Sequence, residues 1–223
     1  MNGLLVVNKP KGITSFDVIR RLRRVTGERK IGHTGTLDPM ATGVMVLLFG
    51  TATKQAGDYS KLDKSYRTEV TLGSNSSTGD AEGELKGVSD RQPERAEIEN
   101  VLEGFVGEIT QTPPVYSAIK IGGQEAYKRA RRGEAVDMPS RQVSVHSIKL
   151  IDYVYPVITF EADVSSGTYI RTLAEDIGSK LGTGAYLSSL VRTRVGEFEL
   201  GQAISLNDTN LTRENVIEAL KLL

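Results

Sequence analysis

The sequence contains no cysteine among its 223 residues. Disulfides, cysteine-ligated metals and cysteine nucleophiles are therefore excluded, and the composition fits a reducing compartment such as the cytoplasm. No stretch approaches the roughly 18 apolar residues that a membrane-spanning helix needs, and the apolar run near the N-terminus is too short for a secretory signal. We expect a soluble, cytoplasmic protein without a membrane partner.

The sequence also lacks an excess of charge of either sign, since 28 Lys and Arg balance 28 Asp and Glu. Phosphate binding normally depends on a basic surface, so a net charge of zero is unhelpful for a nucleic-acid partner. The charges are unevenly distributed, however: residues 9–30 and 120–141 are rich in Lys and Arg, whereas residues 78–110 are rich in Asp and Glu. Each run alone is typical of a solvated face, but two basic runs on either side of a candidate active site favour an RNA partner.

The most informative segment is residues 32–43, Gly-His-Thr-Gly-Thr-Leu-Asp-Pro-Met-Ala-Thr-Gly. It places Asp38 in a loop of turn-forming residues just before the apolar strand predicted over residues 44–49. Functional residues often lie on such loops. Two interpretations are open from the residues alone. Asp before Pro is a common start of a turn or helix, and an Asp aimed by a loop of this kind is a candidate catalyst.

Helical periodicity predicts a helix over residues 16–25, capped by Ser15. Phe16, Ile19 and Leu22, with Val18 and Val25, would form its buried stripe, and its arginines would face away as a basic surface.

Other segments mix strands and helices without regular alternation. We predict strands over residues 66–72, 142–150 and 157–164, and helices beginning near Pro93, Thr168 and Arg213. This order favours an α+β single domain over a doubly wound sheet.

The loop around Asp38 resembles the catalytic motif of the TruB family of bacterial tRNA pseudouridine synthases, which surrounds a nucleophilic Asp. Five more segments resemble parts of that family in the same order along the chain, so the resemblance covers nearly all of it: residues 5–12, 64–67, 113–120, 165–173 and 184–193. The resemblance implies the pseudouridine synthase fold, a mixed and mostly antiparallel central sheet flanked by helices, with the active site in a cleft. It implies no cofactor and no metal.

The family resemblance also suggests how the chain is organised. We expect one catalytic domain over residues 1–223, with an RNA-gripping thumb insertion at about residues 114–141, the second basic stretch. Members of the family often end in a small RNA-binding domain, and we expect this chain to lack it, which would reduce RNA affinity more than chemistry. A monomer is expected.

Three catalytic residues follow from the resemblance. Asp38 is the nucleophile, and attack on the ribose, attack on the base and assistance of elimination all stay open. Arg171, expected on the first turn of a helix, would keep Asp38 ionised, although a surface arginine is the ordinary alternative. Tyr66 would stack on the target uracil, although a tyrosine of the core or the sheet surface is the ordinary alternative. Proton abstraction from C5 is less suited to a phenol, which loses its proton only well above neutral pH.

Six further residues match family positions that bind or border the substrate. For each, an ordinary structural role is open as well: a turn histidine, a core leucine, or charged and aromatic residues that brace loops. They are His33, Leu190, Lys9, Asp80, Tyr116 and Lys120.

The sequence therefore predicts an enzyme that flips the T-loop uridine of tRNA (position 55) out of its stack and isomerises it to pseudouridine. The alternative is a non-catalytic protein that binds and refolds tRNA with the same cleft. The presence of Asp38, Arg171 and Tyr66 together argues against that alternative, because binding alone needs no nucleophile. A third interpretation, an Asp-based hydrolase of a small molecule, lacks a companion acid at fixed spacing.

Overall fold

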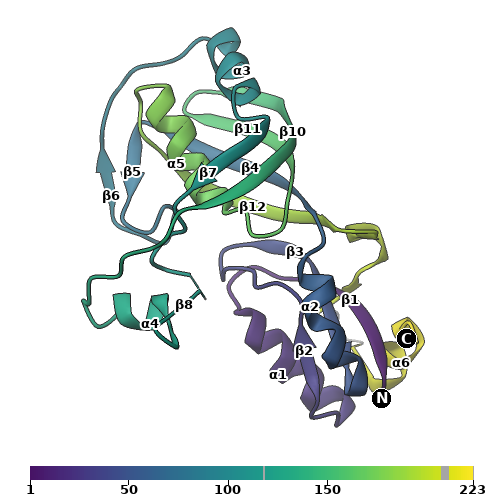
Figure 1. Cartoon of the computed structure of the whole chain (residues 1–223). Helices are drawn as coiled ribbons and strands as arrows, with labels where there is room; N and C mark the ends of the chain where they lie inside the picture. The colour runs from purple at the N-terminus through teal and green to yellow at the C-terminus, as the bar shows by residue number, and fades with distance from the viewer. Residues whose placement is uncertain (118, 207–210, 223) are drawn as a thin grey trace. The chain divides into compact units, whose positions relative to one another are not determined.

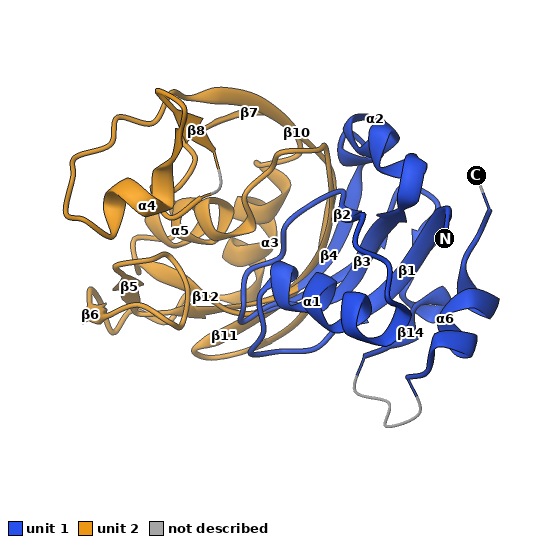
Figure 2. Cartoon of the chain, turned by 90° about the horizontal axis from the view of Figure 1, so that it is seen from below, with its two compact units in different colours: residues 1–67, 190–223 blue, residues 68–189 orange. Residues whose placement is uncertain are grey.

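The computed structural model describes residues 1–117, 119–206 and 211–222. Ala118, in the predicted thumb, and Leu223, at the end of the last predicted helix, lie outside the described residues. The chain forms two compact units, residues 1–67 with 190–223 (unit 1) and residues 68–189 (unit 2) (Figure 2). The chain passes from one unit to the other within β4 (Lys64–Leu72) and within β12 (Ala185–Val195). One catalytic domain over residues 1–223 stays a prediction.

Unit 1 is built on a mixed sheet in which β3 (Thr42–Phe49) lies between β1 (Gly3–Lys9) and β12 (Figure 1). β3 runs antiparallel to β1 and parallel to β12. Three short strands extend this sheet: β2 (Ile31–His33), β13 (Phe198–Glu199) and β14 (Ile204–Ser205). The helical segments are α1 (Ser15–Thr26), η1 (Gly50–Gln55), α2 (Ala56–Ser60), η2 (Leu200–Gln202) and α6 (Arg213–Ala219).

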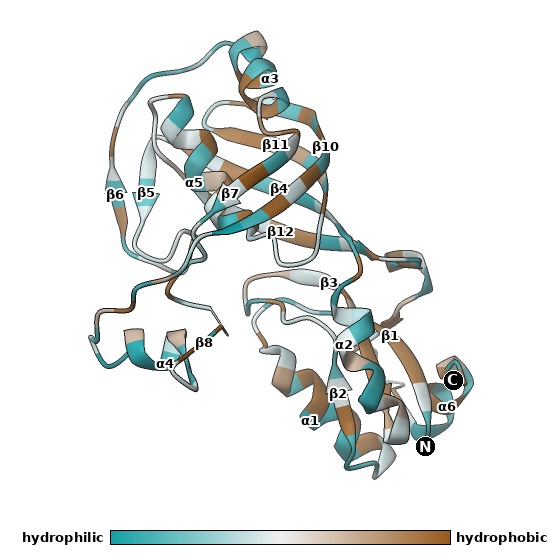
Figure 3. Ribbon diagram, viewed as in Figure 1, coloured by the Kyte–Doolittle hydropathy of each residue, from teal (hydrophilic) through white to brown (hydrophobic). Residues whose placement is uncertain are grey.

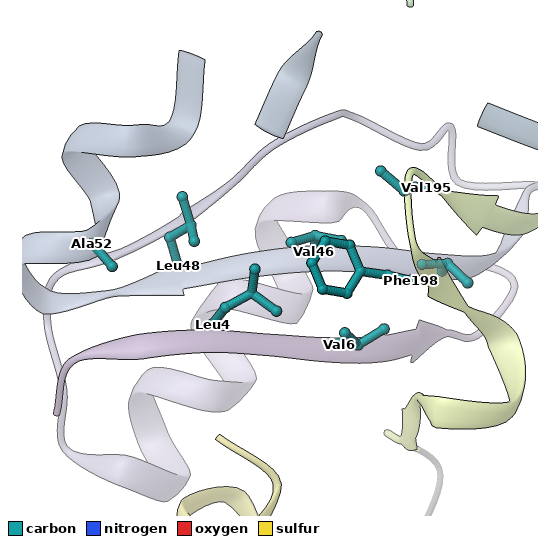
Figure 4. Close-up of a cluster of buried hydrophobic side chains, with 8 residues drawn as sticks. Leu4, Val6, Val46, Leu48, Ala52, Val195 and Phe198 are labelled. Atoms are coloured by element: carbon teal, nitrogen blue, oxygen red, sulfur yellow. The ribbon is translucent and has the colours of Figure 1, made fainter. Parts of the chain in front are cut away.

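The core of unit 1 fixes the position of β3. Leu4 lies opposite Leu48 and Val6 opposite Val46 in the β1–β3 register, and these side chains pack with Phe198 (Figure 4). All residues of β3 after Thr42 are buried. A one-residue slip would exchange the two faces of the strand, so this packing specifies one register. The loop that enters β3 is therefore attached to a rigid strand.

Unit 2 contains the remaining parts of β4 and β12, with β11 (Val157–Val164), β10 (Arg141–Val154) and β7 (Gly107–Gln111) following β4 in the sheet. Buried and more exposed residues alternate along β11, as its sequence predicts. Figure 3 shows the hydropathy of the residues along the strands of this sheet. Two helices, α3 (Arg95–Glu103) and α5 (Ile170–Lys180), belong to this unit. Smaller elements are β5 (Ser74–Ser76), β6 (Leu85–Gly87), β8 (Lys120–Ile121), β9 (Gln124–Glu125) and α4 (Ala126–Ala130).

The predicted α+β class is confirmed, and the strands predicted over residues 66–72, 142–150 and 157–164 lie within β4, β10 and β11. No helix in the described ranges is long and apolar enough to cross a lipid bilayer.

Two predicted details of α1 are wrong. The N-cap is Thr14, whose hydroxyl accepts a hydrogen bond from Asp17 N while the Asp17 carboxylate accepts one from Thr14 N. Ser15 is buried and bonds elsewhere. Phe16 is 54% exposed, since the buried stripe consists of Val18, Ile19 and Leu22 and the aromatic ring lies beyond its edge.

Candidate active site

The predicted site residues divide between the two units. Unit 1 holds Asp38, Tyr66, His33, Leu190 and Lys9, and unit 2 holds Arg171, Asp80, Tyr116 and Lys120.

Asp38 lies half-buried in the loop between β2 and β3. Its carbonyl accepts a hydrogen bond from Ala41 N (3.1 Å), which closes a turn with Pro39 in the second position. Proline suits that position because its ring fixes φ near the value the turn needs. The residue begins a turn that leads into a strand rather than a helix, so the helix-start alternative is wrong.

Ser15 clamps the residue before Asp38. Its hydroxyl donates to the Leu37 carbonyl (2.9 Å) and accepts from Leu37 N (2.8 Å), and both side chains are buried. One side chain thus satisfies both backbone groups of Leu37. The first turn of α1 and the Asp38 loop therefore hold each other in place.

Replacing Ser15 with Ala should lower the free energy of unfolding by about 2 kcal/mol, because two buried backbone groups of Leu37 lose the hydroxyl that bonds them. Urea unfolding measures the loss. Ser60→Ala, which removes an exposed hydroxyl bonded to Gly57 O, is the matched control and should change stability by less than about 0.5 kcal/mol. Equal losses in the two variants would show that the clamp contributes nothing.

Lys9 supports the other side of the same turn. Its fully buried side chain donates through Nζ to the carbonyls of Pro10 (2.9 Å), Ile13 (2.7 Å) and Pro39 (3.3 Å). Gly12 N also donates to the Pro39 carbonyl (2.8 Å). Burying an ammonium is costly unless its donors are satisfied, and these carbonyls satisfy them. The loop-bracing role considered for Lys9 corresponds to these contacts.

Arg192 on β12 is a bracing residue that sequence reasoning missed. The buried guanidinium donates to the carbonyls of Val44 (2.7 Å), Gly35 (3.1 Å) and Thr36 (3.5 Å). The Asp38 loop is consequently tied to the sheet over several residues. The signal in the sequence was an arginine two residues after Leu190, in a strand whose other buried residues are all apolar.

His33 ends β2 beside this loop and is half-buried. Its buried Nδ1 has no hydrogen-bond partner within the described residues. Burial lowers the pKa of the imidazole below its usual value, and the nearby charge of Arg192 lowers it further. Both effects favour the neutral form of the His33 ring.

Tyr66 and Leu190 are both buried, on β4 and β12 respectively. Lys64, on the same face of β4 as Tyr66, donates through Nζ to the carbonyls of Ser60 and Leu62. Burial lowers the pKa of the Lys64 ammonium to about 8, with a further lowering by Arg192. The strand that carries Tyr66 is thus attached to the end of α2.

Arg171 lies on the first turn of α5, as predicted, and it is buried rather than on the surface. Its guanidinium donates to the carbonyls of Thr78 (3.2 Å) and Tyr116 (2.9 Å), and it forms an ion pair with Asp80 (3.7 Å). Gln111 holds the start of the helix by bonding both backbone groups of Tyr169. Arg171 therefore has a fixed position within unit 2.

Asp80 is a buried member of this cluster. Its Oδ1 accepts hydrogen bonds from the Thr78 hydroxyl (2.6 Å) and from Glu82 N (3.1 Å), and its Oδ2 faces Arg171. Burying a carboxylate costs free energy unless hydrogen bonds and a cation replace its lost hydration, and these partners do so. The bracing alternative considered for Asp80 corresponds to these contacts.

Glu175, one helical turn after Arg171, was not predicted. Its carboxylate lies against Gly79, where an added Cβ would be 3.1 Å from Oε1. Burial raises the pKa of Glu175 above its usual value, as do the charges of Asp176 and Asp80, and Arg171 lowers it in part. Burial likewise raises the pKa of Asp176.

This shift predicts that the stability of the protein depends on pH, and that Glu175→Gln should weaken that dependence. The folded protein retains the Glu175 proton to a higher pH than the unfolded chain, so stability falls as pH rises from the usual glutamate pKa through the raised one. The variant should match wild type at low pH and become the more stable of the two above that window. Thermal unfolding across pH tests this, with the exposed Glu69→Gln as control; parallel curves for wild type and Glu175→Gln would contradict it.

Tyr116 and Lys120 belong to the predicted thumb. The carbonyl of Tyr116 accepts a hydrogen bond from Arg171, and the side chain of Tyr116 is 36% exposed. Lys120 is exposed and pairs through its backbone with Glu125 in the β8–β9 hairpin. In α4 and just after it, two cations lie over the ring of Tyr127: the Lys128 ammonium at 5.9 Å and the Arg131 guanidinium at 5.6 Å from the ring centroid. The segment is thus basic and partly aromatic.

Residues 23–170 match the family model described as TruB family pseudouridylate synthase (N terminal domain), and residues 171–219 match the tRNA pseudouridylate synthase B C-terminal domain. A tRNA pseudouridine synthase B from Cupriavidus taiwanensis is 48% identical over 209 residues, 92% of this chain and 66% of that protein. The chain belongs to the TruB family. A second tRNA pseudouridine synthase B, from Geobacillus thermodenitrificans, is 44% identical over 93% of this chain and 72% of its own length.

Solved structures agree with this family assignment. A chain of a Cbf5–Nop10–Gar1 complex aligns with a TM-score of 0.77 at 27% identity, over 99% of this chain and 60% of that one. A chain of an H/ACA RNP bound to a substrate RNA containing 2′-deoxyuridine aligns with a TM-score of 0.70 at 27% identity, over 92% of this chain and 51% of that one. The predicted pseudouridine synthase fold is confirmed. The chain spans about two thirds of its curated TruB relatives, and the expected lack of a C-terminal RNA-binding domain stays a prediction.

Proposed function

We propose that this chain isomerises uridine to pseudouridine in tRNA, with Asp38 as the nucleophile. One observation carries the proposal: in this chain, a member of the TruB family, the side chains of Ser15, Lys9 and Arg192 hold the Asp38 loop in place. A carboxylate on a braced loop is positioned before substrate binds, and such positioning can supply a large part of a rate enhancement.

The reaction needs a nucleophile and groups that hold a detached base, but no net exchange of atoms with a cofactor. The bond between uracil N1 and ribose C1′ breaks, the base turns, and C5 forms a bond to C1′. C5 then loses its proton, and N1 ends with one. Asp38 is suited to act at the sugar–base junction, and carboxylates form covalent intermediates in related substitutions.

We propose that Arg171 and Tyr66 complete the catalytic set. Arg171 supplies a permanent positive charge in a fixed position, and Tyr66 supplies an aromatic face for the flipped uracil. We assign substrate-binding roles to the remaining matched positions. His33, Leu190, Tyr116 and Lys120 would act directly, and the buried Lys9 and Asp80 would act by bracing the loops beside the substrate.

We further propose that the target is the T-loop uridine at position 55 and that the T-stem-loop of tRNA is the partner. The support is the resemblance of residues 32–43 to the TruB motif and the curated relatives named tRNA pseudouridine synthase B. The basic residues of α1 and of residues 120–141 are consistent with an RNA partner. A monomer that acts in the cytoplasm is part of the same proposal.

The test is tritium release from unmodified tRNA labelled with tritium at uracil C5, with tRNA binding measured in parallel by fluorescence anisotropy. The proposal predicts catalytic release, because C5 exchanges its proton for the bond to ribose. Tight binding without release would instead support the non-catalytic tRNA-binding alternative. Absence of both would contradict an RNA function for the chain.

A further inference from the structure

Phe16 is an aromatic side chain that the core of unit 1 does not use. It lies on the first turn of α1 and is 54% exposed. The guanidinium carbons of Arg20 and Arg23 each lie 5.8 Å from its ring centroid. Arg20 is in turn ion-paired with Asp17. The ring is thus flanked by two cations, one of them held in place, while more than half of its surface stays open.

The position of Phe16 links it to the Asp38 loop. The preceding residue, Ser15, is the clamp that bonds both backbone groups of Leu37. On the other side of the turn, Gly12 N donates to the Pro39 carbonyl. The helix turn that displays Phe16 therefore packs directly on the residues that flank Asp38, within one unit.

The surroundings of the ring are strongly basic. Arg20 and Arg24 are exposed, and Arg21 and Arg23 are partly exposed. The one acidic side chain on α1, Asp17, is engaged with Thr14 and Arg20. An exposed aromatic ring among cations is complementary to a nucleic acid, whose bases stack on aromatic and guanidinium faces while its phosphates pair with arginine.

We infer that Phe16, with Arg20 and Arg23, forms a stacking site for an unpaired nucleotide of the RNA whose target uridine reacts at Asp38. The inference rests on the proposed function and adds a binding position to it. Unpaired nucleotides are the suitable ligand, because bases inside a duplex have no open face to offer. The ion pair with Asp17 orders Arg20 in advance, so less side-chain freedom is lost when RNA binds.

The test compares Phe16→Ala, Phe16→Leu and Phe16→Trp in binding to unmodified tRNA, measured by fluorescence anisotropy. We expect the Ala and Leu variants to bind about tenfold more weakly, and the Trp variant to bind at least as tightly as wild type, since only a ring restores stacking. Val154→Ala removes another exposed apolar side chain (69% exposed), at the end of β10, and should leave binding unchanged. Thermal unfolding of each variant verifies that the fold is intact.

Two further arms separate stacking from charge. A fully paired, blunt-ended RNA duplex of two strands should bind wild type and Phe16→Ala equally. The slope of log affinity against log salt should stay the same in Phe16→Ala and become shallower in Arg20→Gln. Wild-type affinity of Phe16→Leu for tRNA would overturn the inference, and so would equal weakening of tRNA and duplex binding in Phe16→Ala. Unchanged tRNA binding in every Phe16 variant would also overturn it and would point to a protein partner for the ring.

Failure of this inference is distinguishable from failure of the proposed chemistry. Binding is measured without turnover, so a wild-type protein that binds tRNA but releases no tritium still reports on Phe16. If wild type does not bind tRNA at all, both the inference and the proposed function are wrong.

Discussion

Asn in place of Asp38 should reduce tritium release from C5-labelled tRNA by about 10⁴-fold or more, the scale on which removal of a nucleophile acts in other enzymes. The amide has nearly the same shape but cannot attack a carbon centre, so the loss should fall on turnover. Affinity for tRNA should stay within about threefold of wild type, because the loop is held by Ser15, Lys9 and Arg192 rather than by the carboxylate group alone.

The control for Asp38→Asn is Asp58→Asn, which makes the same change at an exposed position on α2 of the same unit. It should retain wild-type release. Release by Asp38→Asn at a rate near that of Asp58→Asn would mean that another residue is the nucleophile, and that the braced loop serves binding only.

Leu in place of Arg171 should lower the free energy of unfolding by about 3–5 kcal/mol, because it leaves the buried Asp80 carboxylate without its cation. The carbonyls of Thr78 and Tyr116 lose donors in the same variant. We also expect pseudouridine formation to be lost. Asp80→Asn should cost less, since its remaining oxygen still accepts from Thr78 and Glu82.

A double-mutant cycle separates the coupling free energy between Arg171 and Asp80 from the other effects of each substitution on stability. Arg171→Leu combined with Asp80→Asn should lose about 1 kcal/mol less than the sum of the single losses, because the second change no longer breaks an ion pair. Arg95→Leu is the control: its partner Glu99 and Arg95 itself are exposed, so the loss should be under about 1 kcal/mol. A loss of that small size in Arg171→Leu would contradict a structural role for the buried pair.

Local patterns in the sequence predict part of this structure well. Alternation along residues 157–164 identified β11, and the apolar run of residues 44–49 identified the buried strand β3, because burial on one or both faces leaves a direct trace in residue order. The turn at Asp38 was also visible, since Pro39 and the nearby glycines restrict the backbone locally.

Tertiary contacts explain what the sequence did not reveal. Thr14 and Ser15 both have a hydroxyl suited to a helix cap, and only the contact with Leu37, 22 residues later, decides that Ser15 serves the loop. Arg192 braces carbonyls more than 140 residues away in the chain. Phe16 fits the helical period but lies at the edge of the stripe, where neighbouring arginines compete with the core. The half-buried acid Glu175 likewise depends on contact with the Gly79 turn.

The most direct test of the central proposal is to locate the product within tRNA. Wild-type protein is incubated with an unmodified tRNA transcript and with a second transcript in which cytidine replaces the uridine at position 55, and pseudouridine is mapped by chemical modification and primer extension. We predict one pseudouridine, at the T-loop position of the first transcript, and none in the second. Pseudouridine at another position would contradict the T-loop assignment, and its absence from both transcripts would contradict the proposed isomerase.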